Sequence, residues 1–179
     1  NDIVGSVSNF YAFLVNHPFL QASAIKTPPP EGWPEEHREI FRKLGKSDEV
    51  VDLLCHLPYI DDDNWEWFHD TKPINYVSPL NLRRIDGNYE SKRYLFEPQG
   101  QVLPAHVFSL TNGRLYGVWL LLDIQAGTVT EFSVLNGPTP QVSEEQNASG
   151  TAWRLYPTKP IREFFATCQE KMQGGASAP

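Results

Sequence analysis

The chain combines 179 residues, 40% of them hydrophobic and 21% charged, with a formal net charge of −7, a composition typical of one globular domain over 1–179. A protein that neutralises phosphates carries a basic face, so the acidic balance argues against nucleic acid and anionic membranes as partners. The longest apolar run, residues 118–122, is too short to cross a bilayer, and two cysteines are too few for a secreted disulfide framework, so we predict a cytoplasmic protein.

Three helices are predicted in the first third of the chain. Apolar residues at helical spacing predict an amphipathic helix over 3–16. The proline-rich stretch 26–34 predicts an extended connector. Two further helices follow over 34–44 and 47–57, and Ser47 suits the N-cap of the second of these. Because few residues join them, these two helices should pack against each other.

Residues 59–101 have no regular hydrophobic period. Short strands are predicted near 74–77 and 93–97, and the Asp-Gly-Asn sequence at 86–88 predicts a turn between them.

The clearest pattern is an antiparallel meander over 105–135. Its parts are a strand over 105–110, a hairpin turn at 111–113, a strand over 115–123, a turn at 125–127 and a strand over 128–135. The middle strand has apolar residues on both faces, with Trp119 on one and Leu120 on the other. Such a strand is covered on both sides, so it should be central in the sheet.

The C-terminal part predicts a polar, disordered loop over 137–150, a strand over 152–156 and a helix from Pro160. The tail over 173–179 should be flexible. The whole pattern predicts an α+β fold, in which an antiparallel sheet with the meander at its centre lies between N-terminal helices and a C-terminal helix.

Large aromatic side chains follow an acidic turn at 61–63. Three consecutive aspartates lack the spacing of a calcium loop, so a solvated turn is expected there. The aromatic candidates for a ligand or partner site are Trp65, Trp67, Phe68, His69 and Tyr76, together with Trp119 from the meander. Rings at this density either fill the core or line a pocket or contact surface.

Recognisable catalytic and cofactor motifs are absent from the sequence. It contains no Gly-x-Ser-x-Gly, no glycine-rich phosphate loop, and no pair of histidines or cysteines at zinc-ligand spacing. We therefore predict no cofactor and no metal. His106 opens the first meander strand and is a candidate general base if a partner lies within hydrogen-bond reach. Tyr116 is a candidate hydrogen-bond donor.

Several phrases of the sequence carry a resemblance to known proteins. They are Leu-Gly-Lys-Ser-Asp at 44–48, His-Leu-Pro-Tyr-Ile at 56–60, His-Val at 106–107, Gly-Val-Trp-Leu-Leu-Leu-Asp at 117–123 and Gly-Thr-Val-Thr at 127–130. Over about 10–165 the chain resembles a group of uncharacterised fungal proteins, and its order of elements is similar to that of the SUKH superfamily. That superfamily includes a fungal cell-wall regulator domain and bacterial immunity proteins that bind toxins. The resemblance implies an α+β binding module with no catalytic residues to carry over.

Two functions of different classes follow as hypotheses. The first is a non-catalytic binding module for a protein partner, acting through the acidic and aromatic surface around 61–76. The second is a cofactor-independent enzyme of secondary metabolism, a cyclase or isomerase, that holds a hydrophobic small molecule in an aromatic-lined pocket. In the second, His106, Tyr116 or a tryptophan indole would donate hydrogen bonds. The sequence leaves the oligomeric state open.

Overall fold

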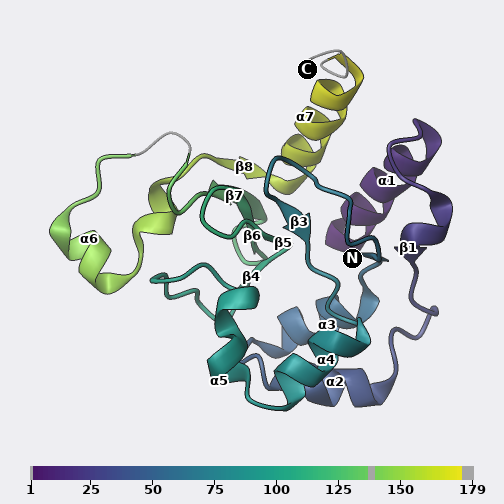
Figure 1. The fold of residues 1–179 in the computed structure, drawn as a ribbon, viewed down its shortest axis with the longest axis horizontal. Coiled ribbons are helices and arrows are strands. Elements are labelled where there is room, and N and C mark those ends of the chain that lie inside the picture. The colour runs from purple at the N-terminus through teal and green to yellow at the C-terminus, as the bar shows by residue number, and fades with distance from the viewer. Residues whose placement is uncertain (1, 137–139, 175–179) are drawn as a thin grey trace.

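The computed structural model describes residues 2–136 and 140–174. Its helices, with η marking 3-10 helices, are α1 (Asp2–Asn16), η1 (Ala22–Ala24), α2 (Glu35–Arg42), α3 (Asp48–His56), α4 (Pro79–Asp86), α5 (Tyr89–Lys92), η2 (Arg93–Leu95), α6 (Glu144–Ser149), η3 (Ala152–Leu155) and α7 (Ile161–Gly174). Its strands are β1 (Ile25–Lys26), β2 (Tyr59–Ile60), β3 (Lys72–Pro73), β4 (Val107–Ser109), β5 (Thr111–Asn112), β6 (Trp119–Asp123), β7 (Thr128–Phe132) and β8 (Thr158–Pro160). Figure 1 shows helices before and after the central strands, which confirms the predicted α+β class.

A four-stranded antiparallel sheet in the order β4-β6-β7-β8 lies at the centre of the fold. Every residue of β6 is buried. Leu120 faces the large hydrophobic core and Trp119 faces a smaller cluster on the opposite side, so the predicted central position of this strand is confirmed. The turn predicted at 125–127 is also present, and Gly127 adopts there the positive φ of 68° that glycine tolerates best.

The large core lies between the sheet and the helices α1, α3 and α7. Helices α1 and α7 run side by side (Figure 1). The ring centroid of Phe10 in α1 is 5.3 Å from that of Phe165 in α7 and 5.1 Å from that of Trp67. Phe10 has no exposed surface. The apolar stripe predicted over 3–16 therefore docks α1 against the C-terminal helix.

The second and third predicted helices are confirmed as α2 and α3, which pack against each other. Ser47 is the N-cap of α3, and its hydroxyl accepts a hydrogen bond from the backbone N–H of Val50 at 3.3 Å. Between the two helices Gly45 takes a left-handed conformation with φ 73°. Local capping chemistry was therefore enough to place this helix pair.

The strands predicted at 74–77 and 93–97 are wrong. The residues between β3 and β4 instead form α4, α5 and η2. The start of α4 carries a recognisable signal, because Ser78 caps its first turn and Pro79 occupies its first position. Asn88 likewise caps α5. The short apolar stretches around these caps were mistaken for strands.

The hairpin turn predicted at 111–113 is also wrong, because β5 pairs with β3 rather than turning back. The chain turns later, and the backbone N–H of Gly117 donates to the carbonyl of Gly113 at 2.7 Å. The hydroxyl of Thr111 donates to the carbonyl of Val118 at 2.8 Å. These bonds hold the residues before β6 outside the four-stranded sheet, so the predicted strand over 115–123 is shortened at its start.

The polar stretch over 137–150 contains a helix where disorder was predicted. Helix α6 starts with a capping box, in which the Ser143 hydroxyl accepts from the backbone of Gln146 and the Gln146 side chain accepts from the backbone of Ser143. This Ser-x-x-Gln signature was present in the sequence. Residues 137–139 lie outside the described residues.

The C-terminal region differs from the prediction at two places. Residues 152–155 form η3 rather than a strand, and the fourth strand of the sheet is β8, which follows η3 and precedes α7. Helix α7 continues to Gly174, so the start of the tail predicted over 173–179 is helical. Residues 175–179 lie outside the described residues.

Candidate functional site

Three of the aromatic residues predicted to contact a ligand or partner are buried. The exposed fraction is 4% for Trp67, 3% for Tyr76 and 2% for Trp119. A partner protein contacts exposed side chains, so burial removes these three from a contact surface, and their predicted role toward a ligand stays a prediction. Their positions fit the alternative that the sequence left open, in which the rings fill the core.

The polar atoms of Tyr76 and Trp119 form hydrogen bonds inside the fold. The Tyr76 hydroxyl donates to the carbonyl of Ser109 at 2.6 Å, and Trp119 Nε1 donates to the carbonyl of Arg114 at 3.0 Å. Burial raises the pKa of the Cys168 thiol to about 11, although the adjacent Trp67 side chain acts in the opposite direction. Such a thiol stays protonated near neutral pH and is a poor nucleophile.

The other three predicted aromatic-site residues reach the surface. Trp65 is half-buried, and its Nε1 donates to the carbonyl of Phe19 at 3.2 Å, which fixes the direction of the ring. Phe68 is half-buried as well. The His69 side chain is 84% exposed, and its Nε2 lies 3.3 Å from a carboxylate oxygen of Asp70. Of the six residues of the predicted aromatic site, Trp65, Phe68 and His69 are therefore the three that reach the surface.

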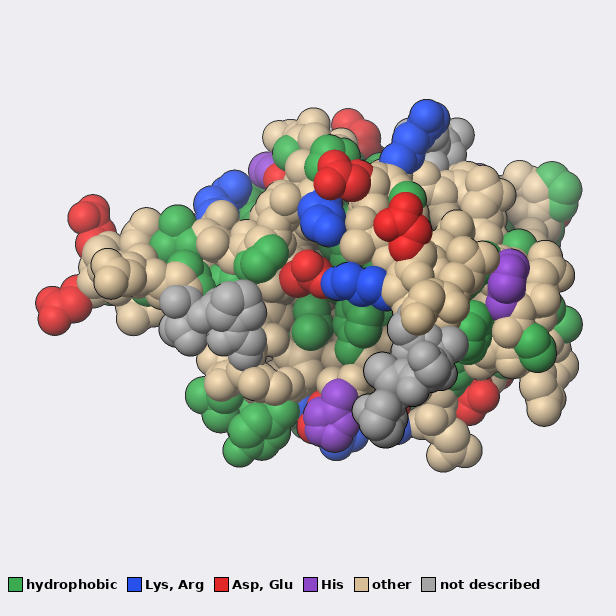
Figure 2. Space-filling model, turned by 90° about the horizontal axis from the view of Figure 1, so that it is seen from above, with side chains coloured by type: hydrophobic (Ala, Val, Ile, Leu, Met, Phe, Trp, Pro, Cys, Tyr) green, Lys and Arg blue, Asp and Glu red, His purple; other side chains and the backbone are tan. Residues whose placement is uncertain are grey.

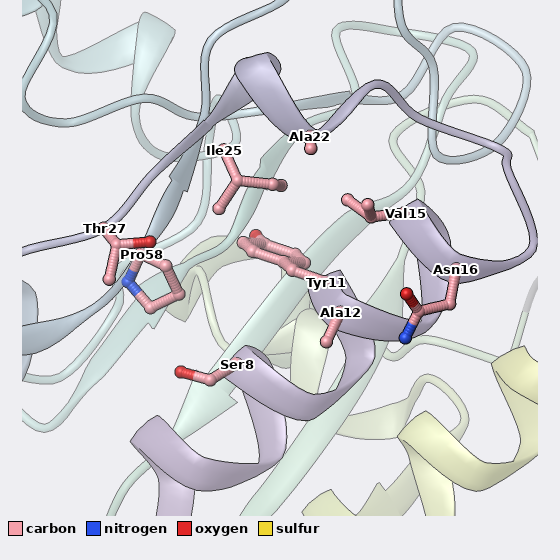
Figure 3. A pocket seen from close by; sticks show the side chains of 9 residues that line it. All are labelled: Ser8, Tyr11, Ala12, Val15, Asn16, Ala22, Ile25, Thr27 and Pro58. Atoms are coloured by element: carbon pink, nitrogen blue, oxygen red, sulfur yellow. The ribbon is translucent and has the colours of Figure 1, made fainter.

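An apolar groove of about 300 Å³ lies between α1 and the segment that includes η1 and β1. Its lining residues are Ser8, Tyr11, Ala12, Val15, Asn16, Ala22, Ile25, Thr27 and Pro58. Figure 3 shows Tyr11 reaching from α1 toward Ile25. Ser8 and Ala12 stand one helical turn apart and have short side chains, so this face of α1 leaves room for a guest.

A second hollow of about 440 Å³, here called the Trp65 hollow, adjoins the apolar groove. Its lining residues are Val15, Pro18, Phe19, Leu20, Gln21, Ala22, Asp62 and Trp65. Val15 and Ala22 line both hollows, so the two are neighbours on the surface. We call them together the paired hollow. It contains Trp65 from the predicted site, whereas its α1 wall was not predicted as functional.

The acidic turn at 61–63 borders the Trp65 hollow through Asp62. The Asp62 carboxylate accepts from the backbone N–H of Asn64 at 2.9 Å, which is a local turn contact. Lys72 Nζ donates to the main-chain carbonyl of Asp63 at 2.6 Å. Within residues 2–136 and 140–174, the carboxylates of this turn form no ion pair with a Lys or Arg side chain. Their negative charge is therefore exposed to solvent and accessible to a partner.

The two candidate catalytic residues are far apart. His106 Nε2 lies 3.7 Å from an oxygen of Asp123, the last residue of β6, whereas Tyr116 precedes the first residue of that strand. At about 3.4 Å per residue the two ends of β6 are roughly 14 Å apart. Neither residue lines the paired hollow. His106 and Tyr116 therefore do not converge on one reacting atom.

A buried ion pair borders a small interior cavity. Lys46 Nζ lies 2.6 Å from Glu97, and the exposed fractions of the two side chains are 6% and 4%. Arg93 donates to the same carboxylate at 3.0 Å. Burial lowers the pKa of Lys46, while the nearby Glu97 acts to raise it. The cavity beside them is about 10 Å³, which has room for about one water molecule and none for a substrate.

Another hollow, of about 320 Å³, lies between α1 and α7 and is lined by Gly5, Ser6, Asn9, Arg162, Phe165, Ala166 and Gln169. Figure 2 shows hydrophobic side chains on one face in separate groups between polar and charged ones. In the described part of the chain, no three His, Cys, Asp or Glu side chains are grouped to hold a metal ion. No helix among the described residues has the length and apolarity of a membrane span.

Comparison with protein-family models, with curated proteins and with solved structures found no match to this chain. The resemblance to the SUKH superfamily therefore stays a prediction.

Proposed function

We propose that this chain is a non-catalytic binding module that takes a segment of a partner protein in the paired hollow. The observation that supports this is that an uncharged groove of about 300 Å³ and a mixed hollow of about 440 Å³ are neighbours and share Val15 and Ala22 in their linings. Protein interfaces have this make-up, with an apolar centre and a polar rim. Trp65 stands in the second hollow, and tryptophan is a frequent anchor of protein interfaces.

A site for a small apolar molecule is the second candidate. The lining of the apolar groove carries no charged side chain, and its volume is at the lower end of the range for ligand pockets. The cyclase or isomerase alternative needs polar groups that converge on a reacting atom. Since His106 and Tyr116 stand outside both hollows, we rank binding above catalysis.

A matched pair of alanine substitutions tests the proposed function. Ala12 in α1 and Ala148 in α6 are both exposed helical alanines, but only Ala12 lines the apolar groove. Peptides would be selected from a displayed library on the immobilised wild-type protein, and their dissociation constants measured with Ala12→Arg and Ala148→Arg. We expect Ala12→Arg to weaken binding at least about tenfold, because a bulky cation fills the groove. Ala148→Arg should leave binding unchanged.

Two results would contradict the proposal. One is the failure of any peptide to be enriched on the wild-type protein. The other is equal binding to the wild type and to folded Ala12→Arg, checked by circular dichroism. Native mass spectrometry of the protein can instead detect a bound apolar metabolite. If this metabolite competes with the peptides, a site for a small apolar molecule becomes the favoured function, and the groove is still the binding site.

A further inference from the structure

The segment beside the Trp65 hollow is acidic. Residues 61–70 contain five carboxylates and no Lys or Arg. Asp61, Asp62 and Asp63 are all exposed. Lys72, a cation next to this turn, contacts a main-chain carbonyl of the turn rather than a carboxylate. The local field at this end of the paired hollow is therefore negative.

The apolar groove at the other end has a different chemistry. Its nine lining residues include no Asp, Glu, Lys, Arg or His. Tyr11 lies in its wall, and burial raises the pKa of this phenol, so the ring stays neutral at physiological pH. A charged side chain placed in this groove would lose hydration without gaining a counter-charge. The two halves of the paired hollow thus select for different side chains.

We propose that the partner segment carries an apolar side chain for the groove and, a few residues away, a Lys or Arg side chain for Asp62 at the Trp65 hollow. This inference rests on the proposed function and adds the chemistry of its partner. An exposed ion pair contributes little affinity. Its charge still selects the partner and increases the association rate, because unlike charges attract during the encounter and like charges repel. The same field disfavours an acidic segment of equal hydrophobicity.

Charge substitutions at Asp62 test this inference with the peptides that bind the wild-type protein. Asp62→Asn keeps the side-chain oxygen that accepts from Asn64, so the turn is preserved while the charge is lost. Asp62→Lys reverses the charge. Glu145→Lys in α6 gives the same change of net charge at an exposed position outside both hollows. It therefore separates a local effect from the effect of overall charge.

We expect the enriched peptides to contain Lys or Arg at a fixed distance from an apolar residue. Asp62→Asn should weaken their binding about threefold and Asp62→Lys about tenfold, with the loss greatest at low salt. Glu145→Lys should leave binding unchanged. Replacing the peptide Lys by Glu should restore binding to Asp62→Lys. This rescue is not expected from a merely damaged turn.

Different failures point to different conclusions. If Ala12→Arg abolishes binding while Asp62→Lys binds like the wild type, the charge inference is overturned and the proposed function stands. Enriched peptides without basic residues would overturn it as well. If no peptide binds, or if binding ignores Ala12→Arg, the proposed function itself fails.

Discussion

Glu97 is a carboxylate with almost no contact with water, since 4% of its side chain is exposed. It accepts from Arg93 at 3.0 Å and lies 2.6 Å from Lys46 Nζ. Two cations therefore share one buried anion. The interaction joins the loop between α2 and α3 to η2, which are far apart in sequence. Removing the anion would leave Lys46 buried without its counter-charge.

We predict that Glu97→Gln lowers the free energy of unfolding by about 3 kcal/mol, the loss typical of breaking one side of a buried pair. Urea unfolding followed by circular dichroism measures it. Glu90→Gln is the control, because Glu90 pairs with the same Arg93 at 2.6 Å but is 77% exposed. The control should leave the stability unchanged. Equal losses in the two variants would show that burial gives Glu97 no special role.

Single residues also mark the limit of prediction from the sequence. Trp65 and Trp67 are two positions apart, yet Trp65 lines the Trp65 hollow and Trp67 stacks on Phe10 in the core. The segment that holds them has no helical or strand period, so no rule of spacing assigns either ring a side. The aromatic density is visible in the sequence, whereas the burial of Trp67 depends on its contact with Phe10 in α1.

Among the elements, those with local signals were predicted best. Helix α3 has Ser47 as its cap, and the turn between β6 and β7 has Gly127 at a positive φ. Helix α6 has an equally local capping box that was overlooked in a polar stretch. The pairing of β5 with β3 has no local signal, because the two strands are far apart in the sequence. The walls of the paired hollow come mostly from residues 8–27, and Pro58, Asp62 and Trp65 join them from later in the chain without a local signal.

The turn between β5 and β6 docks on the segment after Trp67 through a glycine. A Cβ atom on Gly117 would lie 2.1 Å from the backbone oxygen of Asp70, so one of the two backbones would have to move. We predict that Gly117→Ala lowers the free energy of unfolding by about 1–3 kcal/mol, the usual loss from overpacking. Thermal and urea unfolding of the variant measure this loss.

Gly5 in α1 provides a control of opposite sign. A Cβ atom there meets nothing within 4 Å. Alanine has the higher helix propensity, so Gly5→Ala should raise the free energy of unfolding by about 0.5–1 kcal/mol. If Gly117→Ala were equally stabilising, the close approach to Asp70 would have no energetic consequence and the docking of this turn would need another explanation.

The whole molecule buries several tyrosine hydroxyls around one core. Burial raises the pKa of Tyr11, Tyr59, Tyr76 and Tyr89 above the ordinary value of 10.0. The folded chain therefore holds these protons more tightly than the unfolded chain does. The stability linked to them is fully present below about pH 10 and is lost as the pH rises further. Lys46 acts in the opposite direction because burial lowers its pKa, but it is one group against four.

We therefore predict cooperative alkaline unfolding above about pH 10. Ellipticity and the ultraviolet absorbance of tyrosinate would be recorded in one titration, and the absorbance step of the buried tyrosines should coincide with the loss of ellipticity. Tyr76→Phe provides a check, since it removes one of the ionisable groups together with its hydrogen bond to Ser109. Its stability should be lower than that of the wild type at neutral pH and should fall less steeply in the alkaline range. Ionisation of all tyrosines while ellipticity is retained would mean that the phenols are reached without unfolding, and that the aromatic core is open to water.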